Sequence, residues 1–377
     1  MKFAHLLAFL LVSMKAVALP NVQVVQSVPL ETNLQINGIV ETANAWVGLI
    51  NAAKSTLDIE QFYISSQTGQ ALDAVLNSIK AAAARGVKVR IMVDAKFYQN
   101  YSNDPRMLAQ VPNIQVKVID YSSRGGVQHA KYFVVDQSLA YVGSANFDWL
   151  AMSHIHELGL VFSEPNTCAA LEMIFNRDWN FAQTSITPTA IEGVQRFFTS
   201  PLSVLASPAK DLPAGVPPTL DTLLALINGA KTSVQVQMYQ YSTSVYQSAA
   251  RFTDLEQALK KAAARGVQVQ VMVDQATLKN GRADVQSLTS QKNIQVKIIT
   301  IPQWSGGPLQ YARLSHSKYM IIDGVMSWVG SENWSQSYFT QTRNVGILVQ
   351  DASVTASVAQ VFNKVWTSPY VSAPAFR

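Results

Sequence analysis

The 377-residue chain contains a single cysteine, Cys168, and only five histidines. One cysteine excludes an internal disulfide and any metal site built from several cysteines, and five histidines leave little room for a histidine-rich one. Charged residues make up 14% of the chain, against about 25% in an ordinary globular domain. Hydrophobic residues make up 48%, which is ample for a core and excludes a disordered chain.

The N-terminal segment has the pattern of a secretory signal peptide. Lys2 precedes an apolar run over residues 3–14, and Ala16-Val17-Ala18 fits a small-x-small cleavage site. The alternative is a membrane anchor, but 12 residues form about 18 Å of helix, short of the roughly 30 Å of a bilayer core. We expect residues 1–18 to be cleaved and the mature chain, with no transmembrane segment, to be secreted or periplasmic. Its net charge would then fall from +5 to +3, too little to indicate a polyanion partner.

The rest of the chain is an internal repeat. The sequence AAARGV at residues 82–87 recurs at 262–267, an offset of 180, and later matches have an offset of 187. Each copy reads strand–helix–strand, which predicts parallel strands joined by a crossover helix. We therefore predict an α/β fold of two pseudo-symmetric halves, each a mixed, mostly parallel sheet flanked by helices. The predicted halves are residues 19–200 and 201–377, and the Pro-, Ser- and Thr-rich stretch 184–218 reads as their connection.

Each copy carries the pattern HxKxxxxDxxxxxxGSxN, with His129 to Asn146 in the first and His316 to Asn333 in the second. A pattern with six fixed positions that occurs twice in register is not a chance match. Residues i and i+2 of a strand share one face, so each His–Lys pair points the same way. Two facing copies would gather two imidazoles, two ammonium groups and two amides around one point. Such a cluster suits a phosphodiester, because the cations and amides bind its oxygens while the imidazoles supply attack and proton transfer.

The twin pattern resembles the HKD motifs of the phospholipase D superfamily. The resemblance implies one active site shared by the halves, with no cofactor, and a metal-independent reaction through a phosphohistidine. His129 resembles the usual nucleophile and His316 the acid and base, although pseudo-symmetry leaves the reverse order open. Lys131, Lys318, Asn146 and Asn333 resemble the residues that hold the phosphate in the family. The glycine before Ser144 and before Ser331 lets the backbone come close, so we predict that these two serines bind the phosphate as well. Asp136 and Asp323 have the opposite strand parity, and we interpret them as structural residues behind the site.

One position breaks the symmetry of the two copies. Glu157 aligns, at the offset of 187, with Asn344. In the family a carboxylate here often supports a catalytic histidine, and a histidine with a carboxylate partner keeps its proton longer. We therefore expect Glu157 and Asn344 behind the two histidines, with a division of labour between them. The alternative is a structural glutamate.

Further segments resemble one branch of the superfamily, the animal lysosomal PLD-like proteins and their bacterial relatives. They are residues 45–49, 59–63, 135–137, 143–149, 157–161, 207–208, 220–224 and 330–340. Characterised animal members act as five-prime exonucleases on single-stranded DNA and RNA, and acid lipid transfer has also been attributed to them. Those members have a membrane anchor, structural cysteines and an acidic variant of the second motif. This chain departs from all three, and Asp323 keeps the usual residue.

Aromatic residues lie close to both motifs. We predict that Trp149, Trp304 and Trp334 line the substrate, either by stacking on bases or by forming an acyl groove. Packing in the core is the alternative for any one of them. His154 and His156 form an HxH pair, but no third ligand is apparent nearby, so we expect no metal site.

Three functions are compared on this basis. The first is a nuclease that digests single-stranded nucleic acid from an end, which the branch resemblance favours. The second is a phospholipase D or phosphatidyl transferase at a membrane. The third is a binding protein with a dead site, which two complete motifs disfavour. Nothing in the sequence indicates the oligomeric state.

Overall fold

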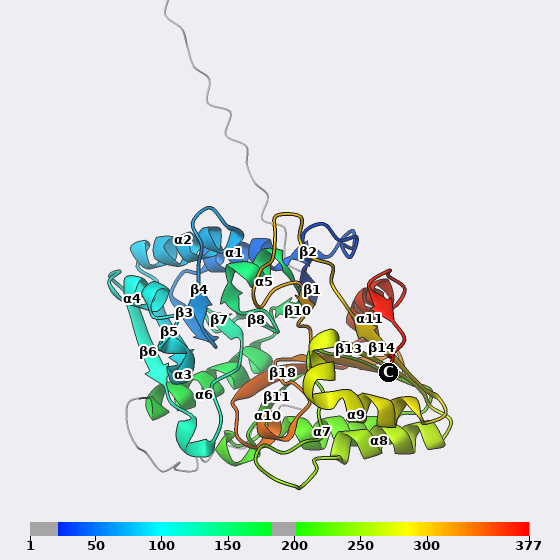
Figure 1. Cartoon of the computed structure of the whole chain (residues 1–377). Helices are drawn as coiled ribbons and strands as arrows, with labels where there is room; N and C mark the ends of the chain where they lie inside the picture. The colour runs from blue at the N-terminus through cyan, green and yellow to red at the C-terminus, as the bar shows by residue number, and fades with distance from the viewer. Residues whose placement is uncertain (1–21, 183–200, 377) are drawn as a thin grey trace, which may run out of the picture.

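The computed structural model describes residues 22–182 and 201–376, so the expected signal peptide lies outside the described residues. Two sheets build the two halves (Figure 1). The first sheet has the strand order β2-β1-β10-β8-β7-β3-β5-β6. Its strands are β1 (Val22–Ser27), β2 (Val40–Glu41), β3 (Thr56–Gln61), β5 (Lys88–Asp94), β6 (Ile114–Ile119), β7 (Tyr132–Val135), β8 (Leu139–Gly143) and β10 (Ile155–Phe162). The short β15 (Leu314–Ser315) of the second half also joins this sheet, parallel to β10.

The second sheet repeats this plan, with the order β11-β18-β17-β16-β12-β13-β14-β19. Its strands are β11 (Leu202–Ser207), β12 (Ser233–Met238), β13 (Gln268–Asp274), β14 (Ile294–Ile299), β16 (Tyr319–Ile322), β17 (Met326–Gly330), β18 (Asn344–Val349) and β19 (Val371–Ser372). The expected α/β fold of two similar halves with mixed sheets is confirmed. The boundary at residue 200 stays a prediction, because residues 183–200 are not described.

The expectation that the sheets are mostly parallel is wrong. In the first half, the long parallel ladders join β3 to β5 and β5 to β6. The motif strands β7 and β8 form an antiparallel hairpin instead. Between the paired Val135 and Leu139, Asp136 and Gln137 have φ of 48° and 55°, the left-handed backbone of a type I′ turn, which the Ser138 N–H closes on the Val135 carbonyl at 3.0 Å. The strand–helix–strand pattern therefore describes only part of each sheet.

Helices cover both sheets. In the first half, α1 (Thr42–Ala52) and α2 (Ala71–Ala84) pack together over one face, and α7 (Thr219–Gly229) and α8 (Asp254–Ala264) do so in the second. The other faces meet in a shared core that includes α6 (Pro165–Phe181) and α11 (Ala352–Trp366). This core contains Tyr132 of β7 and Tyr319 of β16, so the motif strands of both halves pack into the same core. None of the helices in the described ranges is long and apolar enough to span a bilayer.

Candidate active site

The two motif histidines are each held by the opposite half. The backbone N–H of His129 donates to the carbonyl of Arg343 at 2.8 Å, and its Nδ1 lies 3.0 Å from Oδ1 of Asn344. The backbone N–H of His316 donates to the carbonyl of His156 at 2.8 Å, and its Nδ1 lies 2.9 Å and 3.1 Å from the Glu157 oxygens. The structure therefore places Glu157 and Asn344 behind the two histidines, and each supports the histidine of the other half.

The contacts of Asn344 decide the tautomer of His129. The Asn344 amide nitrogen donates to the carbonyl oxygens of Tyr338 at 2.8 Å and Thr342 at 3.3 Å. Its Oδ1 must therefore face His129, and an amide oxygen only accepts. The proton of the neutral His129 ring then sits on Nδ1, which leaves the lone pair on Nε2.

The two motif serines lie behind the site rather than on the phosphate. The Ser144 hydroxyl is fully buried and donates to Glu157 at 2.5 Å. The Ser331 hydroxyl, also fully buried, donates to Oδ1 of Asn344 at 3.1 Å. The prediction that these serines contact phosphate is therefore wrong: their hydroxyls fix the two side chains that hold the histidines. The sequence could not show this, because the glycine before each serine also suggested an approach to the substrate.

Both motif lysines are fully buried beside the histidines. The Lys131 ammonium donates to the carbonyl of His129 at 2.5 Å, and Lys318 donates to that of His316. Burial lowers the pKa of Lys131 well below its usual range and lowers the pKa of Lys318 to about 7. An anionic diester would offset the burial of these charges, so the pair is suited to a phosphate ligand.

Burial and charge also set the protonation of the histidines. Burial, followed by the ammonium groups of Lys131 and Lys318, lowers the pKa of His129 well below its usual range. Burial raises the pKa of Glu157 to about 7, and burial with the same two lysines lowers that of His316. His129 is therefore neutral at neutral pH, and in the free protein so is His316, because Glu157 is the member of that pair with the higher pKa.

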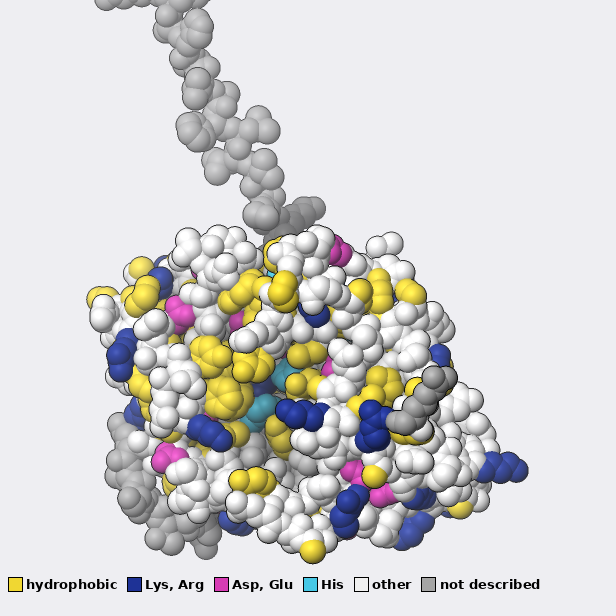
Figure 2. All heavy atoms as spheres, in the orientation of Figure 1, with side chains coloured by type: hydrophobic (Ala, Val, Ile, Leu, Met, Phe, Trp, Pro, Cys, Tyr) yellow, Lys and Arg dark blue, Asp and Glu magenta, His cyan; other side chains and the backbone are white. Residues whose placement is uncertain are grey.

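The histidines lie at the floor of a cleft of about 620 Å³. Figure 2 shows imidazole side chains at the bottom of a hollow, with hydrophobic side chains gathered beside them. Asn146 and Asn333 line this cleft, and the Oδ1 atom of each lacks a protein partner. Both predicted amides are thus brought to one site with both histidines.

An aromatic stack that the sequence analysis missed forms one wall of the cleft. The ring of Tyr63 lies 4.6 Å from that of Tyr101 and 5.6 Å from that of Phe97, both in stacked geometry. Phe62 joins the stack to the ring of His129, at 4.8 Å. Phe62 and Tyr63 follow β3, and Phe97 and Tyr101 follow β5. The signal was available, because the carboxyl ends of adjacent parallel strands meet at one edge of a sheet.

The comparisons with known proteins agree with this geometry. The family model described as "Cardiolipin synthase, PLD-like domain" matches residues 47–179 and 223–366, one match in each half. The chain belongs to the phospholipase D superfamily. It is therefore a phosphoric diester hydrolase.

Individual relatives match this chain over most of its length. Phospholipase D Z of Dictyostelium discoideum is 30% identical, covering 93% of this chain and 90% of its own length. The human 5'-3' exonuclease PLD3 is 30% identical, covering 88% of this chain and 76% of its own length. The crystal structure of phosphatidylserine synthase from Haemophilus influenzae superposes with a TM-score of 0.64 over 88% of this chain and 85% of that one. At 13% identity, that likeness shows the fold alone.

The three predicted tryptophans have three different positions in this phospholipase D-like cleft. Trp149 lines it. Trp304 packs against His154, with ring centroids 4.9 Å apart, and is not among the residues that line the cleft. Trp334 is 1% exposed within the core of the second half, so the prediction that it lines the substrate is wrong. The apolar wall that Trp334 was expected to supply comes from the Tyr63 stack.

The motif aspartates lie at the far end of their strands from the histidines. Asp136 accepts backbone N–H groups of Lys54, Ser55 and Thr56 at 2.7–2.9 Å. Asp323 does the same for residues 231–233 at 2.7–3.1 Å. They are structural, as expected, but they fix the hairpin turn to the start of β3 or β12 and do not contact the site.

His154 and His156 do not converge on a ligand site. His154 contacts the rings of Trp149 and Trp304, whereas the fully buried His156 lies 3.3 Å from the hydroxyl of Ser315. Over residues 22–182 and 201–376, no group of three or more His, Cys, Asp or Glu side chains is arranged to hold a metal ion.

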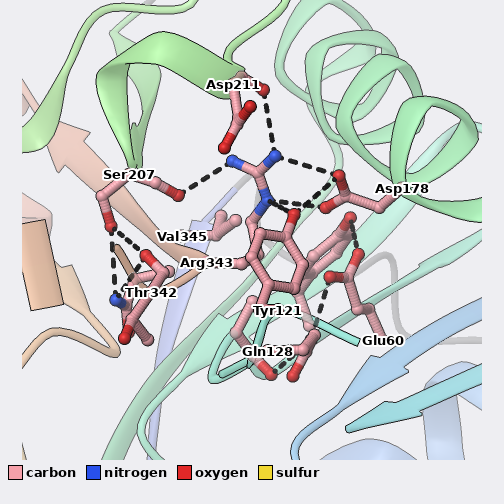
Figure 3. A network of polar contacts seen from close by, with 12 residues as sticks. Glu60, Tyr121, Gln128, Asp178, Ser207, Asp211, Thr342, Arg343 and Val345 are labelled. Carbon is pink, nitrogen blue, oxygen red and sulfur yellow. Dashed lines mark hydrogen bonds and ion pairs between the residues drawn. The ribbon is translucent and has the colours of Figure 1, made fainter. Parts of the chain in front are cut away.

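A buried arginine that the sequence analysis did not single out, Arg343, is the centre of a network of polar contacts (Figure 3). Arg343 is fully buried and pairs with Asp178 of α6, at 2.6 Å and 2.9 Å. It also donates to Tyr121 Oη at 3.1 Å and to the carbonyls of Ser207 and Asp211 at 2.8 Å and 3.0 Å. The residue whose carbonyl holds His129 is therefore locked to both halves of the molecule. Its counterpart in the first half is His156, which has no such ion pair.

We predict that Glu157→Gln lowers kcat by about 10- to 100-fold, because His316 loses the carboxylate that stabilises its protonated form. The alkaline limb of the kcat/KM profile should move to lower pH, since the pKa of the imidazolium falls without Glu157. The check is a pH–rate profile of both proteins on a soluble phosphodiester. The control is Glu41→Gln, which removes another carboxyl with a pKa of about 7 that contacts neither histidine. An unchanged profile in Glu157→Gln would contradict the assignment.

Proposed function

We propose that this protein hydrolyses single-stranded nucleic acid from one end, through a covalent phosphohistidine on His129. The observation that carries the proposal is the aromatic stack of Tyr63, Phe97 and Tyr101, which leads through Phe62 to His129. Stacked flat rings next to a nucleophile are suited to a terminal base, because every base has a π-face and stacking tolerates any sequence.

The proposed reaction has two displacements at phosphorus. Nε2 of His129 attacks and forms the N–P bond while the bond from phosphorus to the leaving oxygen breaks, and His316 gives that oxygen a proton. Water then gives a proton back to His316 and attacks the same phosphorus, which breaks the N–P bond and frees a phosphomonoester. Lys131, Lys318 and the amides of Asn146 and Asn333 stabilise the charge on the non-bridging oxygens. This chemistry requires no metal or cofactor.

The two supporting residues favour this order of roles. Asn344 is neutral and holds the proton of His129 on Nδ1, so Nε2 is a free nucleophile. Glu157 favours a protonated His316 once a bound diester offsets the two ammonium groups that lower the pKa of His316, and an acid must be protonated before it can donate.

The alternative is a phospholipase D or phosphatidyl transferase that binds an acyl chain on the same aromatic wall. The relatives include proteins with phospholipase D and with exonuclease in their names. The cleft favours a nucleotide, because tyrosine hydroxyls and the side chains of Asn100, Gln240 and Asn333 lie among its aromatic rings. We also propose that the protein acts outside the cytoplasm, in a secreted or periplasmic form, on the pattern of residues 1–18.

We predict that the mature chain releases nucleotides from a single-stranded oligonucleotide with a five-prime hydroxyl, and that a chelator has no effect. Vesicles of phosphatidylcholine or phosphatidylglycerol should yield no head group in the same buffer. The measurement is the turnover rate of each substrate with the chelator present, and the His129→Ala protein is the control for contaminating nucleases. Release of head group alone would replace the nuclease proposal with the lipid one, and loss of activity to the chelator would contradict the metal-free route.

A further inference from the structure

A second hollow of about 550 Å³ adjoins the catalytic cleft, and Gln240 lines both. It is formed by the loop 240–246, by the segment 276–280 at the start of α9 (Leu278–Thr289), and by residues 335–337. Its lining is polar, with one cation, Lys279, and one strongly exposed ring, that of Tyr246, at 86% exposure. The reaction described above gives this hollow no role.

Comparison of the halves explains why the hollow exists. By the repeat offsets, Gln240, Thr277, Gly281 and Gln336 occupy the positions of Tyr63, Phe97, Tyr101 and Trp149. The first half fills this place with four aromatic rings, and the second half has none of them. The β-bridges agree with the alignment, since Ile64 pairs with Phe147 and Tyr241 pairs with Trp334. The cleft therefore has the stack of rings on the His129 side, whereas on the other side it opens, beyond Tyr239 and Gln240, into a polar hollow.

Gly281 keeps the second side open. A Cβ built at Gly281 would lie 2.2 Å from the carbonyl oxygen of Tyr241, so no counterpart of Tyr101 fits there. The backbone of α9 departs from helical geometry at this residue, with φ of −115° and ψ of 17°. The backbone at Gly281 therefore excludes an aromatic side chain at this position.

The chemistry places a particular part of the substrate in the hollow. In an in-line displacement, the attacking and leaving atoms lie on opposite sides of phosphorus. If His129 attacks, the leaving oxygen faces His316, whose ring lies 4.9 Å from that of Tyr239, next to Gln240. The group that departs therefore leaves toward the hollow, while the group kept on the enzyme stays near the aromatic stack.

We propose that the hollow binds the first nucleotide of the departing strand, with Lys279 against the next phosphate and Tyr246 stacked on its base. This inference rests on the proposed nuclease function. Under this proposal the two sides of the cleft bind different parts of the substrate. The aromatic stack binds the terminal base, and the polar hollow with its lysine binds the departing strand. A departing strand suits such a site because it carries one charge per nucleotide and has to be released after each cut.

The test measures kcat/KM for a dinucleotide, a trinucleotide and a decamer. A dinucleotide has only the scissile phosphate, so it lacks the phosphate that would meet Lys279. We expect Lys279→Gln to lower kcat/KM by about two- to five-fold on the trinucleotide and the decamer, and by less on the dinucleotide. The slope of log kcat/KM against log salt should become shallower by about 0.7 on the trinucleotide, the value for one lost phosphate contact. Lys292→Gln, an exposed lysine on the same half outside the hollow, should keep the wild-type length dependence.

A second variant tests the hollow itself. Gln336→Trp restores the residue that the first half has at Trp149, and its ring should fill the hollow and remove the preference for longer substrates. If the wild type cleaves oligonucleotides at rates that do not depend on length, or if Lys279→Gln and Lys292→Gln behave alike, the inference is overturned while the nuclease function stands. If the wild type cleaves lipid vesicles and no oligonucleotide, both fail together.

Discussion

With a substrate whose leaving group needs no proton, replacing His316 with alanine should leave the protein trapped as a phosphohistidine, whereas replacing His129 should remove the reaction altogether. The difference follows from the supports of the two rings, because Asn344 leaves His129 a free nucleophile and Glu157 makes His316 the acid. On a nucleotide ester we expect each variant to lose at least about 10⁴-fold in kcat, since the two rings act as a unit.

A nitrophenyl phosphodiester separates the two losses. Its leaving group departs without a proton, so His316→Ala should still form the N–P bond and release about one equivalent of nitrophenolate in a burst. The second step then stalls, because no base activates water. Rapid-quench kinetics and intact mass would detect the burst and the added phosphoryl group, and His129→Ala should give neither. A burst from His129→Ala and none from His316→Ala would reverse the two roles.

The sequence predicted the centre of the site because its chemistry is carried by fixed spacing within one strand and one turn. The His–Lys pairs share a face by strand parity, and the offset of the repeat aligned Glu157 with Asn344. That alignment revealed that the two halves differ in charge at one position. It did not reveal that each residue crosses to the histidine of the other half, because the repeat says nothing of how its copies face one another.

The errors share a physical cause. Ser144 and Ser331 were placed on the phosphate because they are polar and follow a glycine. In the structure their hydroxyls instead satisfy the buried side chains of Glu157 and Asn344, because a buried polar group requires a hydrogen-bond partner. Trp334 is adjacent in sequence to the cleft residue Asn333, yet in an extended segment neighbours point to opposite faces. Proximity in sequence was taken for proximity to the substrate.

The aromatic stack and the Arg343 network were missed for another reason. Both are assembled from segments far apart in the chain, such as Tyr63 with Tyr101, and Asp178 with Arg343. No single window contains either, and they depend on the sheet order and on the packing of α6 against the second half. The aromatic stack could have been predicted from the order of the strands, since it lies at the carboxyl ends of adjacent parallel strands. The Arg343–Asp178 ion pair could not, because it depends on how the two halves pack together.

The Arg343–Asp178 pair should be the most sensitive point of the core. Replacing Arg343 with methionine should lower the free energy of unfolding by about 3–5 kcal/mol, because Asp178 is left as a buried, unpaired charge. The neighbouring Glu60 adds to the cost, since burial and the Asp178 charge already raise its pKa to about 8. Denaturant unfolding followed by tryptophan fluorescence measures the loss. The control is Lys260→Gln, which breaks the pair of a partly exposed lysine with Glu256 on α8. Because Glu256 keeps its hydrogen bond from Ser287, the change should cost no more than about 1 kcal/mol.

A double-mutant cycle separates the two contributions of the ion pair. Asp178→Leu alone strands the positive charge and should cost about as much as Arg343→Met, but the two changes together remove both charges and should cost much less than their sum. The network also holds His129 through the Arg343 carbonyl, a backbone contact that survives the side-chain change. The double variant should therefore keep most of its kcat while each single variant is unstable. If both single changes cost under about 1 kcal/mol, or if the costs simply add, the pair does not join the halves in the way that its geometry indicates.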